Sequence, residues 1–261
     1  MAFSDINLLY SLSGLAVGAI VGFTGVGGGS LMTPLLVLLF NVHPATAVGT
    51  DLLYAAATKS VGTAVHGKAK SVDWQIVRRL ASGSVPATLL TFMAMQEFGL
   101  KGSKGGFLAV MLGVVLLATS LTLLFRHQIV DFMSRHISTS NAARVTALTV
   151  ATGAVLGVLV TTTSVGAGAI GVTALLILYP RLQVLRIVGS DIAHAVPLTL
   201  ISGLGHWWMG DVDWIMLVSL LIGSIPGIAI GSHLAPKLPE RVLRLALAVI
   251  LVLVSLKLIL S

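Results

Sequence analysis

The 261-residue chain contains no cysteine and little charge, since Asp, Glu, Lys and Arg together make up only 10% of it. An ordinary soluble domain carries about 25% charged residues, so most of this surface cannot face water. The lack of cysteine excludes disulfides, cysteine-based metal sites and thiol chemistry. The lack of charge excludes a soluble enzyme, a disordered chain and a nucleic-acid binder, although the formal net charge is +7.

What the chain has instead is long apolar sequence, with 56% hydrophobic residues. A bilayer core of about 30 Å needs roughly 20 apolar residues per helix. Ten apolar segments lie near residues 7–24, 29–42, 45–65, 74–96, 104–125, 144–163, 168–180, 186–206, 213–235 and 241–260. The sequence therefore predicts an all-α polytopic membrane protein with about ten transmembrane segments. Segments 29–42 and 168–180 are short and glycine-interrupted, which is typical of broken or re-entrant helices.

The distribution of positive charge predicts the orientation in the membrane. If all ten segments cross, the loops around 66–79, 126–144, 181–186 and 237–244 share one side and carry twelve Lys and Arg residues, against three on the other side. The positive-inside rule makes the twelve-charge side cytoplasmic. Both termini are then expected outside the cytoplasm, in a bacterial-type inner (cell) membrane.

The two halves of the chain repeat one another at a spacing of about 140 residues. The matching blocks are Thr24–Gly29 with Thr163–Gly168, Val48–Asp51 with Val188–Asp191, His66 with His206, Val72–Trp74 with Val212–Trp214, and Gly83-Ser84-x-Pro86 with Gly223-Ser224-x-Pro226. Internal repeats with interrupted helices are typical of secondary transporters. We expect a first repeat at 1–130, a cytoplasmic linker at 131–143 and a second repeat at 144–261.

The two repeats are expected to face opposite ways. The loop after His66 contains Lys68 and Lys70, whereas the loop after His206 contains Asp211 and no cation. Five crossings per half require such an inversion. An alternative with eight spans and one re-entrant segment per half makes the repeats parallel, and the charge pattern disfavours it.

Several of these motifs resemble the TauE/SafE family of sulfite and sulfonate permeases. The resemblance rests on Gly25–Ser30 with Pro34, on Ala47–Thr50, and on His66 with Val72–Trp74, and it covers nearly the whole chain. In the second half Ala167 interrupts the glycines and Thr173 stands where the first half has Pro34. The resemblance implies export of small sulfur oxyanions or organosulfonates.

The glycine-rich breaks are candidate sites for a substrate anion. A helix N-terminus exposes unpaired N–H groups and about half a positive charge, and glycine lets an anion approach the backbone. The candidate substrate-binding residues are Thr24, Gly27, Gly28, Gly29, Ser30 and Thr50 in the first half, and Thr163, Ser164, Gly166, Gly168 and Ser190 in the second. Close helix packing is the alternative explanation of the glycines.

Two intramembrane aspartates, Asp51 and Asp191, occupy the same repeat position and are candidates for proton coupling. An Asp at the centre of a membrane helix costs about 2.5–3.5 kcal/mol on insertion scales, which indicates a functional or paired role. Capping of a broken helix is the alternative. His194 follows Asp191 by three residues, so an Asp–His relay is one hypothesis for this helix.

Lys59 is the one cation deep in a predicted segment, and we consider it together with His66 and His206 for anion attraction or gating. Lys59 could attract an oxyanion or neutralise a carboxylate on a neighbouring helix, but snorkelling toward the cytoplasmic end is the favoured interpretation. His66 and His206 sit at equivalent helix ends. No His/Glu spacing resembles a zinc site, and neither a metal nor a cofactor is expected.

These observations favour a secondary transporter of a small anion, with protons as the candidate coupling ion and alternating access around a central site. A passive anion channel is an alternative. An intramembrane hydrolase is a weaker one, because Ser190 near His194 is the only tempting nucleophile–base pair and no G-x-S-x-G elbow is present. The expected partners are the substrate anion and the lipid bilayer, with no nucleic acid.

Overall fold

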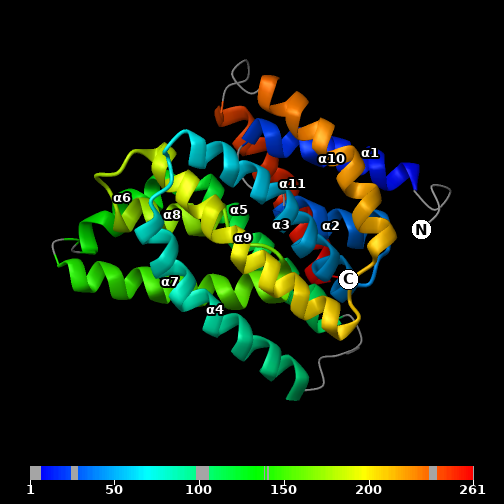
Figure 1. Cartoon of the computed structure of the whole chain (residues 1–261), viewed down its shortest axis with the longest axis horizontal. Coiled ribbons are helices and arrows are strands. Elements are labelled where there is room, and N and C mark those ends of the chain that lie inside the picture. Colours follow the sequence, from blue (N-terminus) through cyan, green and yellow to red (C-terminus); the bar gives the residue numbers. More distant parts are fainter. Residues whose placement is uncertain are drawn as a thin grey trace.

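In the computed structural model, which describes residues 7–24, 29–97, 106–137, 139, 141–234 and 240–260, the ordered elements are helices (Figure 1). They are α1 (Leu8–Thr24), α2 (Gly29–Leu39), α3 (Pro44–Lys68), α4 (Trp74–Glu97), α5 (Gly106–Leu124), α6 (Arg126–His136), α7 (Ala142–Thr163), α8 (Ala169–Leu178), α9 (Val184–Met209), α10 (Trp214–Leu234) and α11 (Glu240–Leu260). Each of the ten predicted segments corresponds to one helix, and the ends agree within three residues. The additional helix, α6, overlaps the segment expected to be a linker.

Helix lengths distinguish full spans from shorter pieces. Among the described residues, α7, α9 and α10 are long and apolar enough to cross a membrane, and α5 with α6 would add a fourth span if this pair, bent by 84°, crosses as one. α2 and α8 have 11 and 10 residues. At about 1.5 Å per residue each extends roughly 15 Å, half of a hydrocarbon core of about 30 Å. Neither can cross a bilayer alone.

The closest helix packing joins α1 to α10 and α4 to α7 (Figure 1). Both contacts are made by glycines that lie directly against the partner backbone, which is how membrane helices approach closely. The glycine–partner pairs are Gly14–Leu220 and Gly18–Ser224 for α1 and α10, and Gly153–Leu80 and Gly157–Ser84 for α7 and α4. Each pair in one contact has its counterpart 139 or 140 residues away in the other. The repeat seen in the sequence therefore holds for helix contacts as well.

α3 and α9 also pack on one another, and they run in opposite directions. Gly49 near the start of α3 lies beside His206 near the end of α9, and Gly189 near the start of α9 lies beside His66 near the end of α3. Adding 140 to Gly49 gives Gly189, and subtracting 140 from His206 gives His66, so the repeat relates the two contacts to one another. α3 and α9 are thus equivalent helices of the two halves, packed antiparallel.

The largest cluster of buried apolar side chains surrounds the first half of α3. Met32 and Leu36 of α2 and Tyr54 of α3 are fully buried there, and they pack with buried residues of α5, α10 and α11. A smaller cluster joins α3 to α7 and α9 through Leu52, Leu156 and others. The polar residues described below are therefore enclosed by protein.

Candidate functional site

Buried ionisable side chains gather where α3 and α9 pack together. Asp51 and Lys59 of α3 are 0% and 7% exposed, and Asp191 and His194 of α9 are 1% and 0% exposed. A buried charge is costly unless it is paired or hydrogen-bonded. The hydrogen bonds and neighbouring charges of these four side chains therefore indicate the role of each.

Asp51 is held near the start of the half-helix α2. The backbone N–H of Thr33 donates to Asp51 Oδ2 at 3.2 Å, and the Thr33 hydroxyl donates a second hydrogen bond to the same oxygen. The Ser164 hydroxyl, at the break between α7 and α8, faces Asp51 without reaching good hydrogen-bonding geometry. Asp51 Oδ1 has no hydrogen-bond partner among the described residues. The carboxylate thus joins α2 of the first half to the helix break of the second.

Asp191 occupies the equivalent place beside the half-helix α8. The backbone N–H of Gly168, the residue preceding α8, interacts with its carboxylate. Asp191 Oδ1 lies so close to Gly171 that a Cβ at this position would collide with it. Asp191 therefore lies at the N-terminal end of α8, where the helix dipole favours negative charge, whereas Asp51 contacts α2 at its fifth residue, one turn into the helix. In the second half, Asp191 thus lies beside Gly168, one of the glycines that the sequence analysis expected to bind a substrate anion.

Lys59 interacts electrostatically with both carboxylates, more strongly with Asp191 than with Asp51, but in the described part of the chain it forms no direct ion pair with either of them. It follows Asp51 by eight residues, about 12 Å along α3, and reaches Asp191 because α9 runs antiparallel beside it. At 7% exposure the side chain does not extend to the end of the bundle. The favoured snorkelling interpretation is therefore wrong, and Lys59 is a buried counter-charge to carboxylates on two helices.

His194 is hydrogen-bonded to α4 rather than to Asp191. Its Nε2 lies 2.9 Å from Ser84 Oγ, and its Nδ1 has no partner among the described residues. The expected Asp191–His194 relay is not formed, because α4 packs on α9 and brings Ser84 to the imidazole. The equivalent contact in the other half joins the Tyr54 hydroxyl to Ser224 Oγ at 2.7 Å. The two Gly-Ser-x-Pro motifs are thus hydrogen-bonded to equivalent helices: the motif on α10 to α3, and the motif on α4 to α9.

Thr50 and Ser190, two of the candidate substrate-binding residues, are hydrogen-bonded to backbone in this structure. Thr50 Oγ1 accepts a hydrogen bond of 3.1 Å from the Asp213 N–H, and Ser190 Oγ accepts one of 2.8 Å from the Asp73 N–H. Ser190 also donates to the Arg186 carbonyl at 2.6 Å. These hydroxyls fix the loops that precede α10 and α4. The Ser190–His194 pair considered for a hydrolase is not formed either.

The second-half glycine motif is a true break between α7 and α8. Ser164, Gly166 and Gly168 have positive φ angles of 59°, 120° and 105°, and Thr163 ends α7 with its hydroxyl donating to the Leu159 carbonyl at 2.6 Å. Only glycine adopts the last two conformations without strain.

The first-half motif is described only in part. Gly27 and Gly28 lie outside the described residues. Thr24 ends α1, and Gly29 and Ser30 begin α2, but their side-chain surroundings also lie outside the described part.

His66 and His206 each contact the residue five positions later, at opposite ends of the α3–α9 pair. His66 Nδ1 lies 2.8 Å from Ser71 Oγ. His206 Nδ1 lies 3.5 Å from Asp211 Oδ2, and its Nε2 lies 2.9 Å from the Thr161 carbonyl. Both histidines therefore hold a loop against a helix end. A role of either histidine in gating remains a prediction.

Sequence reasoning missed several side chains of this site. Ser84 and Ser224 belong to a repeated motif, so their repetition was the available signal. Thr33 carried no signal, because the sequence does not reveal that α2 lies against Asp51. Arg126 had been counted among the loop cations, yet it interacts electrostatically with Asp191 from the α5–α6 bend.

The chain matches the family model described as "Sulfite exporter TauE/SafE" over residues 10–258. It is 37% identical over 254 residues to the "Probable membrane transporter protein YjnA" of Bacillus subtilis (strain 168), covering 95% of this chain and 98% of that protein. It is 28% identical over 232 residues to the "Probable membrane transporter protein YdhB" of the same strain, covering 88% and 91%. No solved structure matches the chain. The chain is therefore an integral membrane protein and belongs to the sulfite exporter TauE/SafE family of membrane transporters.

Proposed function

We propose that the protein is a secondary transporter that exports a small anion, sulfite or an organosulfonate, by alternating access around the α3–α9 contact. The observation that carries this proposal is the buried Lys59, which interacts electrostatically with two equivalent buried carboxylates, each of them in contact with a half-helix. Such a constellation is characteristic of carrier sites at mid-membrane depth. The family name supports the sulfur oxyanion as substrate class.

The proposed architecture is ten segments in two inverted halves, 1–130 and 144–261, with both termini outside the cytoplasm. The antiparallel packing of α3 and α9 supports the inversion, because equivalent helices of parallel repeats would run in the same direction. The charge distribution along the sequence supports the orientation. α2 and α8 act as half-helices within this plan.

The mechanism we propose is replacement of a carboxylate by the substrate. Positive helix ends favour an anion, and Asp191 lies at the start of α8 while Asp51 is bound to Thr33 in the first half of α2. A protonated aspartate loses its attraction to the helix end, and the substrate anion then takes its place beside Lys59. Return of the carboxylate, with release of its proton, displaces the substrate. Each cycle would thus couple anion movement to proton movement.

A flux assay in proteoliposomes tests the function. Purified protein is reconstituted, loaded with sulfite or a short-chain sulfonate, and efflux is measured with and without an imposed pH gradient. We expect saturable efflux that responds to the gradient. Absence of flux for every sulfur oxyanion tried, together with absence of binding, would refute the proposal, and single-channel conductance would indicate a channel instead.

Asparagine at both aspartates is expected to separate coupling from folding. In Asp51→Asn/Asp191→Asn, the amides keep the size of the carboxylates and can still accept the N–H bonds. Transport should lose its dependence on the pH gradient while the protein still inserts and remains folded. The measurement is efflux at several gradients, with circular dichroism and thermal unfolding as controls. Failure to insert would instead show that the aspartates serve as helix caps.

A further inference from the structure

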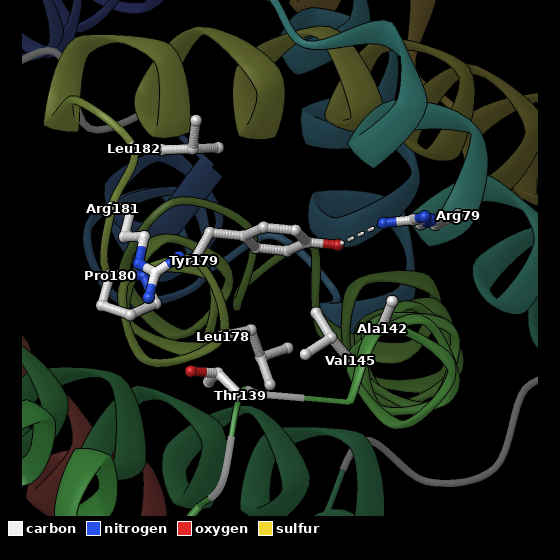
Figure 2. A pocket seen from close by; sticks show the side chains of 9 residues that line it. All are labelled: Arg79, Thr139, Ala142, Val145, Leu178, Tyr179, Pro180, Arg181 and Leu182. Carbon is white, nitrogen blue, oxygen red and sulfur yellow. Dashed lines mark hydrogen bonds between the residues drawn. The ribbon is translucent and has the colours of Figure 1, made fainter.

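A half-open pocket with both polar and apolar walls lies apart from the α3–α9 contact. It has a volume of about 560 Å³, within the range of roughly 300–1,000 Å³ typical of small-molecule sites. α4, the start of α7 and the loop between α8 and α9 enclose it (Figure 2). The lining residues are Arg79, Thr139, Ala142, Val145, Leu178, Tyr179, Pro180, Arg181 and Leu182. We call it the Arg79–Arg181 pocket.

The charge of this pocket is positive at two separate places. Its described lining includes two guanidinium groups and no carboxylate. Figure 2 shows these groups on opposite sides of the Tyr179 ring, Arg79 on α4 and Arg181 on the loop. The floor between them is apolar and includes Val145 and Leu178. The pocket thus has one cationic group at each side and an apolar surface between the two.

A hydrogen-bond chain fixes one of these cations. Arg79 Nη1 donates to the Tyr179 hydroxyl at 3.2 Å, and that hydroxyl lies 2.8 Å from Thr149 Oγ1. The Thr149 hydroxyl donates to the Val145 carbonyl at 2.7 Å, so Tyr179 supplies the proton of the middle bond. One N–H of Arg79 is used in this chain, and a guanidinium carries five. The arginine is therefore held in place with donors left for a ligand.

From this arrangement we infer that the Arg79–Arg181 pocket binds a short organic dianion, with one anionic group on each guanidinium and its carbon chain on the apolar floor. Arginine pairs well with carboxylate, sulfonate and phosphate oxygens because its donors match their geometry. The volume of the pocket accommodates a ligand with two anionic groups, whereas a compact ion such as sulfite would leave most of it empty. The separation of the two cations therefore favours a two-headed ligand.

This site is distinct from the central one but connected to it along α4 and α9. Ser84, the partner of His194, follows Arg79 by five residues, about 7.5 Å along α4. The loop that carries Arg181 leads directly into α9, the helix that contains Asp191. A dianion bound here is placed next to the helices that hold the central site, so the pocket collects anions at the positively charged end of the bundle. Binding here is independent of whether transport occurs.

Binding of propanedisulfonate, compared with propanesulfonate and sulfate, tests the inference. Isothermal titration calorimetry is carried out on the full chain in phosphatidylcholine nanodiscs, which offer no anionic lipid headgroup. The variants are Arg79→Gln and Arg181→Gln. The matched control is Arg78→Gln, since Arg78 is the exposed neighbour on the same helix and does not line the pocket. Lys59→Gln reports on the central site, and thermal unfolding of every variant verifies folding.

We expect the disulfonate to bind wild type about fivefold or more tightly than the monosulfonate, because a second charge-assisted contact is made. Either pocket variant should remove this preference, with Arg78→Gln unchanged and with disulfonate binding retained in folded Lys59→Gln. Equal affinity for the two sulfonates in wild type, or a preference that persists in both folded pocket variants, would overturn the inference. Loss of disulfonate binding in folded Lys59→Gln would also overturn it, by locating the ligand in the central site.

Discussion

Replacing Lys59 by glutamine is expected to lower anion efflux by about 100-fold or more. Lys59 is buried and its ammonium group interacts electrostatically with Asp51 and Asp191, so its removal takes away the positive charge that both carboxylates share. Removing one partner of a buried charge pair typically costs about 3–5 kcal/mol. Initial rates of sulfite or sulfonate efflux from proteoliposomes measure the effect. Lys68→Gln, at the exposed end of the same helix, is the matched control and should retain wild-type rates.

A double variant separates the loss of function from a loss of folding. Lys59→Gln/Asp191→Asn removes one positive and one negative charge together, so the buried net charge is unchanged. We expect its thermal stability to recover relative to Lys59→Gln, while efflux stays low because the cation is still missing. Wild-type efflux in either folded variant would contradict the assigned role of Lys59.

Substituting Gly83 by alanine is expected to destabilise the protein by about 3 kcal/mol, at the upper end of usual overpacking costs. A Cβ at this position would lie on the Val150 carbonyl oxygen and against the Ala154 backbone nitrogen of α7. Backbone atoms cannot rotate away, so α4 and α7 must separate. At roughly 2–4 °C per kcal/mol, the melting temperature should fall by about 10 °C.

Gly67→Ala provides the comparison for this effect. Gly67 has nothing within 4 Å of the position of a Cβ, so the same chemical change should leave the melting temperature nearly unaltered. Gly223→Ala, the repeat counterpart of Gly83, would place its Cβ on the Ser11 carbonyl oxygen and should behave like Gly83→Ala. Equal melting temperatures for Gly83→Ala and Gly67→Ala would show that α4 and α7 are not closely packed there.

Much of the helix plan could be predicted from the sequence because lipid imposes a simple rule on it. Each apolar segment must form a helix, and Pro, Gly and charged residues separate the segments, so the ends of the predicted segments agree closely with the helices. α6 was missed because its sequence, with Arg126, His127, Asp131 and Arg135, reads as a polar linker. The repeat was visible because His, Asp-Trp and Gly-Ser-x-Pro recur in order.

Of the site, the sequence predicted the ionisable residues Asp51, Lys59, Asp191 and His194 but not the partners of these residues. Asp51 and Asp191 were recognisable as buried charges in apolar sequence. Which helix lies against each of them depends on long-range packing. Thr33 has no sequence feature that marks it, and the repeated Gly-Ser-x-Pro motif marks Ser84 without indicating its partner. The snorkelling interpretation of Lys59 was wrong for the same reason. A cation seven residues before His66 looks close enough to the helix end to snorkel, and the sequence does not show that α9 packs beside it.

The glycine contacts of α1 with α10 and of α4 with α7 have a consequence for biosynthesis. Each contact joins a helix that is synthesised early to one that is synthesised later. For α1 the delay is long, because almost the whole chain is translated before α10 leaves the ribosome. A product truncated before α10 would leave the small residues of α1 exposed to lipid, with nothing to bury them. Membrane quality control therefore has a natural signal for incomplete chains, and neither half is expected to persist in the cell when expressed without the other.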